Sequence, residues 1–98
     1  MFASTRTYQI DPTSLAEFNR RVNEGFVPIL QGTKGFIAYY GIDAGNGQWA
    51  SVSIFETQEG ADGSAQAAAS YVAEHLQPFV RSGPTVVAGV VAAAKRKA

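Results

Sequence analysis

Residues 34–57 read KGFIAYYGIDAGNGQWASVSIFET and predict two β-strands joined by a tight turn. Gly45, Asn46 and Gly47 tolerate the positive φ angles that hairpin turns require. The flanking runs, Phe36–Asp43 and Trp49–Glu56, are rich in the aromatic and β-branched residues typical of strands. We expect every other element of the chain to pack on this hairpin or to pair with it.

Side-chain alternation along the hairpin predicts which residues share a face, whether its loop contains two or four residues. One face is aromatic and carries hydroxyl groups, and it contains Phe36, Ala38, Tyr40, Ile42, Trp49, Ser51, Ser53 and Phe55. The other face is more aliphatic, and it contains Ile37, Tyr39, Gly41, Ala50, Val52 and Ile54. We assign the aliphatic face to the helices.

A strand and the start of a helix are predicted before the hairpin. Residues Phe2–Ile10 alternate as a strand, with Arg6 and Tyr8 on its more aromatic side. Asp11 can cap the free N–H groups of a helix, and Pro12 fits the first helical position because it needs no N–H there.

The first helix carries a proline in its second half. Its apolar stripe recurs at three- and four-residue steps, at Leu15, Phe18, Val22, Phe26 and Ile29. Pro28 lacks a helical N–H and crowds the carbonyl of Glu24. We therefore expect a helix over residues 12–31 that kinks near Gly25, with a break at Val27 as the alternative.

A second helix and a last strand follow the hairpin. Thr57 can cap a helix that runs to about Leu76. Its inner stripe is mostly alanine, which allows close approach to the sheet, and contains Ala61, Ala65, Ala68, Val72 and Leu76. Pro84–Ala94, PTVVAGVVAAA, predicts a strand that is apolar on both faces, so we expect both faces to be covered.

The element order strand–helix–strand–strand–helix–strand predicts an α+β fold. It is the ferredoxin-like βαββαβ plan, with two helices on one face of a four-stranded antiparallel sheet. Two helices cover only one face, and the apolar content is 46% against 16% charged residues. We expect a homodimer that buries the other sheet face, since a large apolar patch is rarely left exposed on a monomer.

Composition excludes several classes of function. The formal net charge is zero, which argues against a nucleic-acid partner, and the absence of cysteine excludes disulfides and thiolate metal sites. No apolar run approaches the roughly 20 residues of a membrane helix, and no signal peptide is evident, so we expect a cytoplasmic protein without a membrane partner. We expect one domain over residues 1–94 and a basic tail over residues 95–98.

The chain resembles the dimeric α/β-barrel superfamily, nearest its antibiotic biosynthesis monooxygenase-like branch. The residues that carry the resemblance lie in segments along almost the whole chain: Phe26–Leu30, Gly35-Phe36, Tyr39-Tyr40, Ser53–Thr57 and Tyr71–Leu76. They are packing residues rather than a catalytic signature. The resemblance therefore implies the barrel-forming dimer more strongly than it implies an activity.

Members of that branch include monooxygenases without cofactor that act on polycyclic phenols, and haem-degrading enzymes. The latter use an Asn on the first strand and a Trp and a His on the second helix. Here the first strand has no Asn and the second helix no Trp, and only His75 lies in a comparable place. We therefore expect no haem, no other cofactor and no metal.

Three residues are weak candidates for catalysis: His75, Arg6 and Tyr40. His75 is the sole histidine and could act as a base near neutral pH, although a partly buried residue at a helix end explains it as well. A binding pocket between the sheet and a partner would be lined by Tyr8, Tyr40, Trp49, Ser51, Ser53 and Phe55, with Arg6 holding a phenolate or carboxylate. The competing interpretation is that these aromatics only fill a dimer core.

Two functions from different classes follow. The first is a small-molecule-binding, monooxygenase-like protein that oxidises an aromatic or quinol compound without a cofactor. The second is a non-enzymatic homodimeric stress or accessory protein with no small-molecule site. An open pocket favours the first, and solid packing favours the second.

Overall fold

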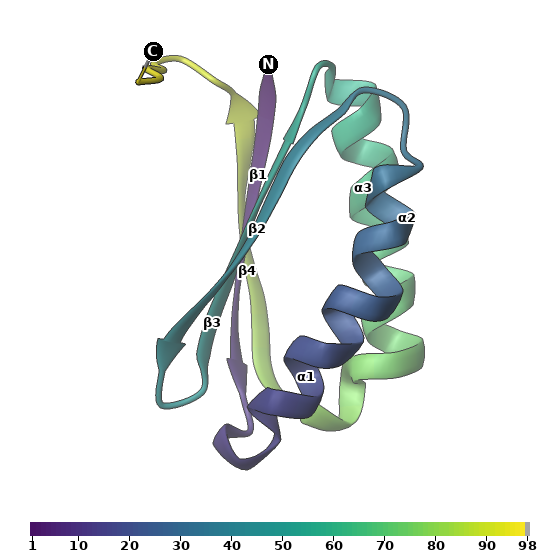
Figure 1. Ribbon diagram of the computed structural model, residues 1–98, viewed down its shortest axis with the longest axis vertical. Helices are drawn as coiled ribbons and strands as arrows, with labels where there is room; N and C mark the ends of the chain where they lie inside the picture. The colour runs from purple at the N-terminus through teal and green to yellow at the C-terminus, as the bar shows by residue number, and fades with distance from the viewer. Residues whose placement is uncertain (98) are drawn as a thin grey trace.

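The computed structural model describes residues 1–97; Ala98, the last residue of the predicted tail, lies outside them. The elements are β1 (Phe2–Ile10), η1 (Pro12–Ser14), α1 (Leu15–Arg21), η2 (Val22–Phe26), α2 (Val27–Gln31), β2 (Phe36–Gly45), β3 (Gln48–Phe55), α3 (Gln58–Tyr71), η3 (Val72–Leu76), η4 (Gln77–Phe79) and β4 (Val80–Val90). The strands form one antiparallel sheet in the order β2-β3-β1-β4. The helices lie together on one face of this sheet (Figure 1), which confirms the ferredoxin-like α+β fold.

The first helical segment continues through Pro28 without a break. A π-helical turn, η2, widens the helix, and the Val27 N–H donates to the Val22 carbonyl five residues earlier. The wider turn lets Pro28 follow at the start of α2, because a π-turn relieves a proline's missing hydrogen bond. The π-helical turn includes Gly25, near which a kink is expected, and the kink itself stays a prediction. The alternative break at Val27 does not occur.

The same π-turn changes which residues the helix buries. Phe18, Val22, Phe26 and Leu30 are buried, whereas Ile29 is exposed. The prediction that Ile29 belongs to the apolar stripe was wrong. Residues four apart shift gradually around an ideal α-helix, which has 3.6 residues per turn, but the wider π-helical turn cancels that shift. The apolar stripe from Phe18 to Leu30 thus stays over the sheet for about three turns.

The predicted helix caps and the hairpin turn are confirmed. The Asp11 carboxylate accepts a hydrogen bond from the Thr13 N–H, and the Thr57 hydroxyl accepts one from the Gly60 N–H. The hairpin loop has two residues, Asn46 and Gly47, both with positive φ. These local features agree with the propensities of the residues that form them.

The predicted facing of the second hairpin strand, β3, was wrong. β3 turns Trp49, Ser51, Ser53 and Phe55 toward the helices, where they are buried. Two bulges in β2 cause the difference. One lies near the turn, where Asp43 pairs with Trp49 and Gly45 with Gln48, and the other lies between Phe36 and Ala38. Each extra residue moves the following side chains to the opposite face.

The bulge at the turn has a local cause. Gly45 adopts φ of +89°, and its N–H donates to the Asp43 carboxylate over 2.9 Å. As a result Tyr39 and Gly41 share the helix-facing side with Ser53 and Ser51, whereas Tyr40 pairs with Val52 on the open side. The predicted place of Tyr39 and Gly41 on the helix side is correct.

The last strand also differs from the prediction. β4 begins at Val80 and ends at Val90, rather than covering residues 84–94, because residues 80–82 pair with the end of β1. It is an edge strand, and Val87 remains 69% exposed. No part of the described chain, residues 1–97, covers both faces of β4. The division between a domain over residues 1–94 and a tail stays a prediction.

Candidate functional site

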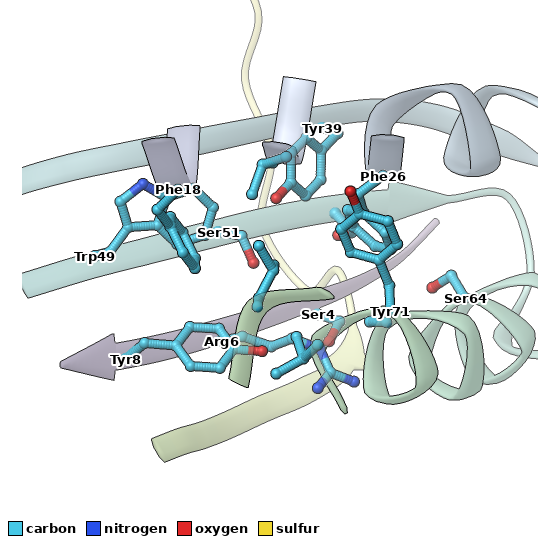
Figure 2. A pocket seen from close by; sticks show the side chains of 15 residues that line it. Ser4, Arg6, Tyr8, Phe18, Phe26, Tyr39, Trp49, Ser51, Ser64 and Tyr71 are labelled. Atoms are coloured by element: carbon cyan, nitrogen blue, oxygen red, sulfur yellow. The ribbon is translucent and has the colours of Figure 1, made fainter. Parts of the chain in front are cut away.

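A small cavity lies between the helix-facing side of the sheet and the helices (Figure 2), with a volume of about 30 Å³. Two strands at the centre of the sheet, β1 and β3, form its floor. The π-turns η2 and η3 lie over it and contribute Val22, Phe26, Val72 and Leu76. Both helical segments thus depart from regular α-helical geometry where they cover the cavity.

Aromatic rings make up much of the cavity wall. Phe18 meets Trp49 edge to face at 5.0 Å between centroids, and Phe26 meets Tyr39 in the same way at 5.7 Å. Tyr71 stacks at a tilt on Phe26 from the other helix. Such edge and tilted contacts are the favoured geometries of aromatic pairs.

Polar groups gather on the sheet side of this aromatic cavity. Six residues on neighbouring strands contribute a hydroxyl or a charge to its lining: Ser4, Arg6, Tyr8, Tyr39, Ser51 and Ser53. The Arg6 guanidinium forms no ion pair among the described residues. A core that needed only packing would not require a half-buried cation in a cavity lined by six aromatic residues.

Tyr39 is the cavity group whose acidity is most altered. Burial raises the pKa of Tyr39 well above its ordinary value, and the nearby Tyr8 adds to the rise, while the Ser51 hydroxyl and the Arg6 guanidinium oppose it. Tyr39 therefore stays protonated at neutral pH. It can donate a hydrogen bond to a ligand oxygen but cannot act there as a base.

Trp49 is held in place from two sides. Its Nε1–H donates to the Asn19 carboxamide oxygen of α1 over 2.9 Å. Its six-membered ring lies against Gly41, where a Cβ would approach the indole to 2.7 Å. Only glycine at this position of β2 leaves room for the ring, so the wall of the cavity depends on this pair.

Two hydrogen bonds join the two helical segments above the cavity. The Tyr71 hydroxyl donates to the Arg21 carbonyl over 2.8 Å, and the Arg21 Nη1 donates to the His75 carbonyl over 3.0 Å. The Arg21 guanidinium also lies 5.0 Å from the centre of the Phe79 ring. Gly25 permits the approach, because a Cβ there would clash with the Tyr71 ring.

Glu17 orients the Arg21 side chain, which joins the two helical segments. Its carboxylate accepts hydrogen bonds from both Arg20 and Arg21, and these bonds lower the pKa of Glu17 to about 2. The charged form is therefore favoured in the folded state. Its stabilising effect is complete above the unfolded pKa near 4.5 and is lost as the pH falls toward about 2.

Replacing Glu17 with glutamine is expected to reduce the loss of stability that occurs as the pH falls from about 4.5 toward about 2. Glu17→Gln should lower the thermal unfolding midpoint at neutral pH and lose less stability than the wild type on acidification to about pH 2. Thermal unfolding followed by circular dichroism at several pH values measures both effects. Glu59→Gln, on the exposed start of α3, is the control. Equal acid profiles for wild type and Glu17→Gln would contradict the assigned role.

The structure brings together most, but not all, of the predicted site residues. Tyr8, Trp49, Ser51 and Ser53 line the cavity, and so does Arg6. They face the helices, however, so the prediction of a pocket between the sheet and a partner was wrong. The bulges of β2 and the burial of Trp49 account for the difference.

Three predicted residues lie outside the cavity. Tyr40 is 61% exposed on the open side of the sheet, and Phe55 is fully buried in the core without contributing to the cavity wall. The side chain of His75 is half-exposed, next to Glu74, and does not line the cavity. It stacks on the outer edge of Tyr71 instead. None of the three can therefore contact a ligand held in the cavity of the same chain.

Several lining residues were not among the predicted site residues. They come from both helical segments and two strands: Ser4, Phe18, Val22, Phe26, Tyr39, Ser64, Ala68, Tyr71, Val72 and Leu76. A serine within the alanine stripe of the second helix was a usable signal, since Ser64 is buried there and donates to the Ala61 carbonyl. For Tyr39, its place on the helix-facing side was the available signal.

The described residues contain no helix long and apolar enough to cross a membrane. Over the same residues, no group of three or more His, Cys, Asp or Glu side chains is arranged to hold a metal ion. No histidine lines the cavity to serve as a haem ligand.

No family model and no curated protein sequence matches the chain. Solved structures do match it over nearly its full length. A monooxygenase from the ActVA-Orf6 gene of Streptomyces coelicolor, in complex with the ligand Nanaomycin D, aligns with a TM-score of 0.78 and 16% identity, over 99% of this chain and 92% of that one.

Two further structures show the same similarity. An antibiotic biosynthesis monooxygenase aligns with a TM-score of 0.75 and 16% identity, over 95% of this chain and 100% of that one. The haem-degrader MhuD of Mycobacterium tuberculosis, with two haems in its active site, aligns with a TM-score of 0.73 and 14% identity, over 98% of this chain and 100% of that one. The chain therefore has the fold of the antibiotic biosynthesis monooxygenase-like proteins.

Proposed function

We propose that the cavity binds the polar edge of a small aromatic molecule and that the protein is a cytoplasmic, monooxygenase-like enzyme for a phenol or quinol. One observation carries the proposal. The Arg6 guanidinium, which forms no ion pair with any residue of the range 1–97, lies in an aromatic cavity beside hydroxyls on neighbouring strands. An apolar site with a few convergent polar groups is the usual form of a small-molecule site.

The chemistry of the lining suits a phenol. A guanidinium beside a phenol favours its ionised form, and the phenolate gives up electrons to oxygen more readily than the neutral phenol does. Tyr39, protonated at neutral pH, can donate a hydrogen bond to a second oxygen of the ligand. The aromatic walls keep water away and so strengthen both interactions.

Trp49 provides the test, because it is the only tryptophan and lines the cavity. Its fluorescence is titrated with quinols, polyphenols and haem, corrected for ligand absorbance. We expect saturable quenching by one class of phenol or quinol, weakened roughly tenfold or more by Arg6→Ala, since a charged hydrogen bond contributes about 1.5–3 kcal/mol. Arg96→Ala, in the exposed tail, removes the same charge and should have no effect.

Oxygen consumption with the quenching ligand then tests for catalysis. Oxygen consumption that is lost in the Arg6→Ala variant supports the proposed enzymatic function. An emission that none of these ligands changes would overturn the proposal and favour the non-enzymatic accessory protein. The small volume of the cavity favours that second function, because it holds few atoms without rearrangement.

The assembly that we propose is a homodimer through the open face of the sheet. That face carries exposed apolar side chains, including Tyr40, Ile42 and Val87, with Val52 at its centre. A second copy related by a two-fold axis would cover it with the same residues from both chains.

Val52→Glu is expected to convert the dimer to a monomer, because it would place two carboxylates without partners in an apolar interface. The mass in solution, from size-exclusion chromatography with light scattering, measures the result. Ala69→Glu, on the exposed side of α3, is the matched control and should remain dimeric. A wild-type chain that is monomeric at all concentrations, or a Val52→Glu variant that remains dimeric, would contradict the interface.

A further inference from the structure

Two rows of paired residues cross the floor of the cavity from strand to strand. In the first row, Ser53 of β3 pairs with Ser4 of β1 on one side and with Tyr39 of β2 on the other. In the second row, Ser51 of β3 pairs with Arg6 of β1. All five residues line the cavity (Figure 2). Directly opposite residues of antiparallel strands have Cα atoms about 4.5–5.5 Å apart, so the five form one polar cluster.

Hydroxyl groups of this cluster are available as hydrogen-bond donors. Ser4 and Ser53 are only 8% and 9% exposed, yet their hydroxyls form no hydrogen bond with any residue of the range 1–97. Neither hydroxyl is enclosed by packing, because no fully enclosed side-chain oxygen in that range lacks a partner. Both therefore face the free space of the cavity. By contrast, Ser64 on the helix side donates its hydroxyl to the Ala61 carbonyl.

The charge of the cavity lining is positive. Among the described residues that line it, Arg6 is the one side chain ionised at neutral pH, since none of them is Asp, Glu, Lys or His. Burial raises the pKa of Tyr39 well above its ordinary value, so its phenol stays neutral and can donate a hydrogen bond. A guanidinium that is partly withdrawn from water is stabilised by an opposite charge beside it. Donors that surround such a cation without a carboxylate favour an anion.

The size of the cavity selects among anions. Its volume of about 30 Å³ is about twice the space that one water molecule needs, and it is far below the roughly 150 Å³ of a cavity that binds benzene. An ion the size of one or two water molecules fits this space, whereas an oxyanion with four oxygen atoms does not. The single charge of Arg6 balances a single negative charge, which favours a monovalent ion.

We propose that the cavity is a binding site for a small monovalent anion of the halide class. The Arg6 guanidinium supplies the opposite charge, and the hydroxyls of Ser4, Ser53 and Tyr39 supply hydrogen bonds. Such a site goes beyond the proposed function, because it requires neither a phenol nor oxygen. A halide and a phenolate edge exclude each other at Arg6, so the halide competes with the phenol; only this competition rests on the proposed function.

Chloride is the probe, and its binding to the full chain is measured from the line width of the chlorine NMR signal with no phenol present. Exchange of chloride with a protein site broadens this signal. Methanesulfonate, a bulkier monovalent anion, keeps the ionic strength constant. We expect the protein to broaden the signal, an equal concentration of bromide to remove the broadening, and additional methanesulfonate to leave it unchanged.

Two cavity variants locate the site. Arg6→Gln should weaken chloride binding roughly tenfold or more, as loss of a charged hydrogen bond predicts, and Ser53→Ala roughly fivefold, as loss of a neutral one predicts. Arg96→Gln in the exposed tail and Ser70→Ala on the exposed side of α3 are the matched controls and should bind chloride like the wild type. Circular dichroism checks that each variant is folded; if Arg6→Gln is not, Ser53→Ala decides the outcome.

An absence of broadening by the wild type overturns the anion site. Equal broadening by the wild type and both cavity variants also overturns it and identifies the chloride as a surface ion only. Either result leaves the proposed function standing, because phenol quenching of Trp49 is measured in methanesulfonate without chloride. Chloride binding that depends on Arg6, together with an emission that no phenol changes, supports the anion site and overturns the proposed function.

Discussion

Trp49→Ala is expected to lower the free energy of unfolding by about 3–5 kcal/mol, the usual cost of deleting a large buried aromatic ring. Trp49 is 4% exposed, contacts Phe18 edge to face at 5.0 Å and lies on Gly41. The substitution removes part of the cavity wall and leaves the Asn19 carboxamide oxygen without its donor. Urea denaturation followed by far-ultraviolet circular dichroism measures the loss.

Trp49→Phe separates the ring from the hydrogen bond. It keeps an aromatic ring in the wall but removes the hydrogen bond to Asn19 and part of the contact area. Loss of the hydrogen bond should lower the free energy of unfolding by about 1 kcal/mol, in addition to the effect of the smaller contact area. Both variants should keep the oligomeric state of the wild type, because Trp49 faces the helices and not the open side of the sheet. Dissociation of a dimer by Trp49→Ala would show that the indole belongs to the interface.

Gly47→Ala is expected to cost about 2–4 kcal/mol of unfolding free energy, through backbone strain and a lost hydrogen bond. Gly47 has φ of +82°, and a Cβ there would lie 2.1 Å from the Ile10 carbonyl oxygen. That oxygen cannot move freely, since the Ile10 N–H donates to the Gly47 carbonyl over 2.7 Å. The substitution forces the hairpin turn away from the end of β1.

Gly63→Ala is the matched control with the opposite expected sign. Gly63 lies within α3, and a Cβ there meets nothing within 4 Å. Alanine should therefore raise the unfolding free energy by about 0.5–1 kcal/mol through its higher helix propensity. Both variants are measured by the same urea titration. Destabilisation of similar size in both would count against the close contact at Gly47.

Local sequence determined much of the fold. Asp11 and Thr57 mark the helix starts, and Asn46 and Gly47 form the turn, because capping and positive φ depend on one or two residues. The order of the elements then restricts the sheet to the ferredoxin-like arrangement. These features could be predicted because each arises from the residues that show it or from their order along the chain.

The faces of the hairpin were decided by tertiary structure. Both faces are apolar, so alternation alone cannot say which one meets the helices, and a single bulged residue reverses the answer. The outcome depends on contacts between distant residues, such as the Trp49 indole with Asn19, thirty positions earlier.

The candidate site depends on the same choice. Arg6, Tyr8, Ser51 and Ser53 were predicted from sequence as polar or aromatic groups of one pocket, and they do lie together. Their neighbours from the helices, such as Tyr71, could not be predicted, because two π-turns set which helical residues point at the sheet. The sequence by itself determined the elements, their order and the chemical character of the pocket. Only tertiary packing, which depends on the apolar surface that each whole face of the sheet buries, decided where the pocket lies.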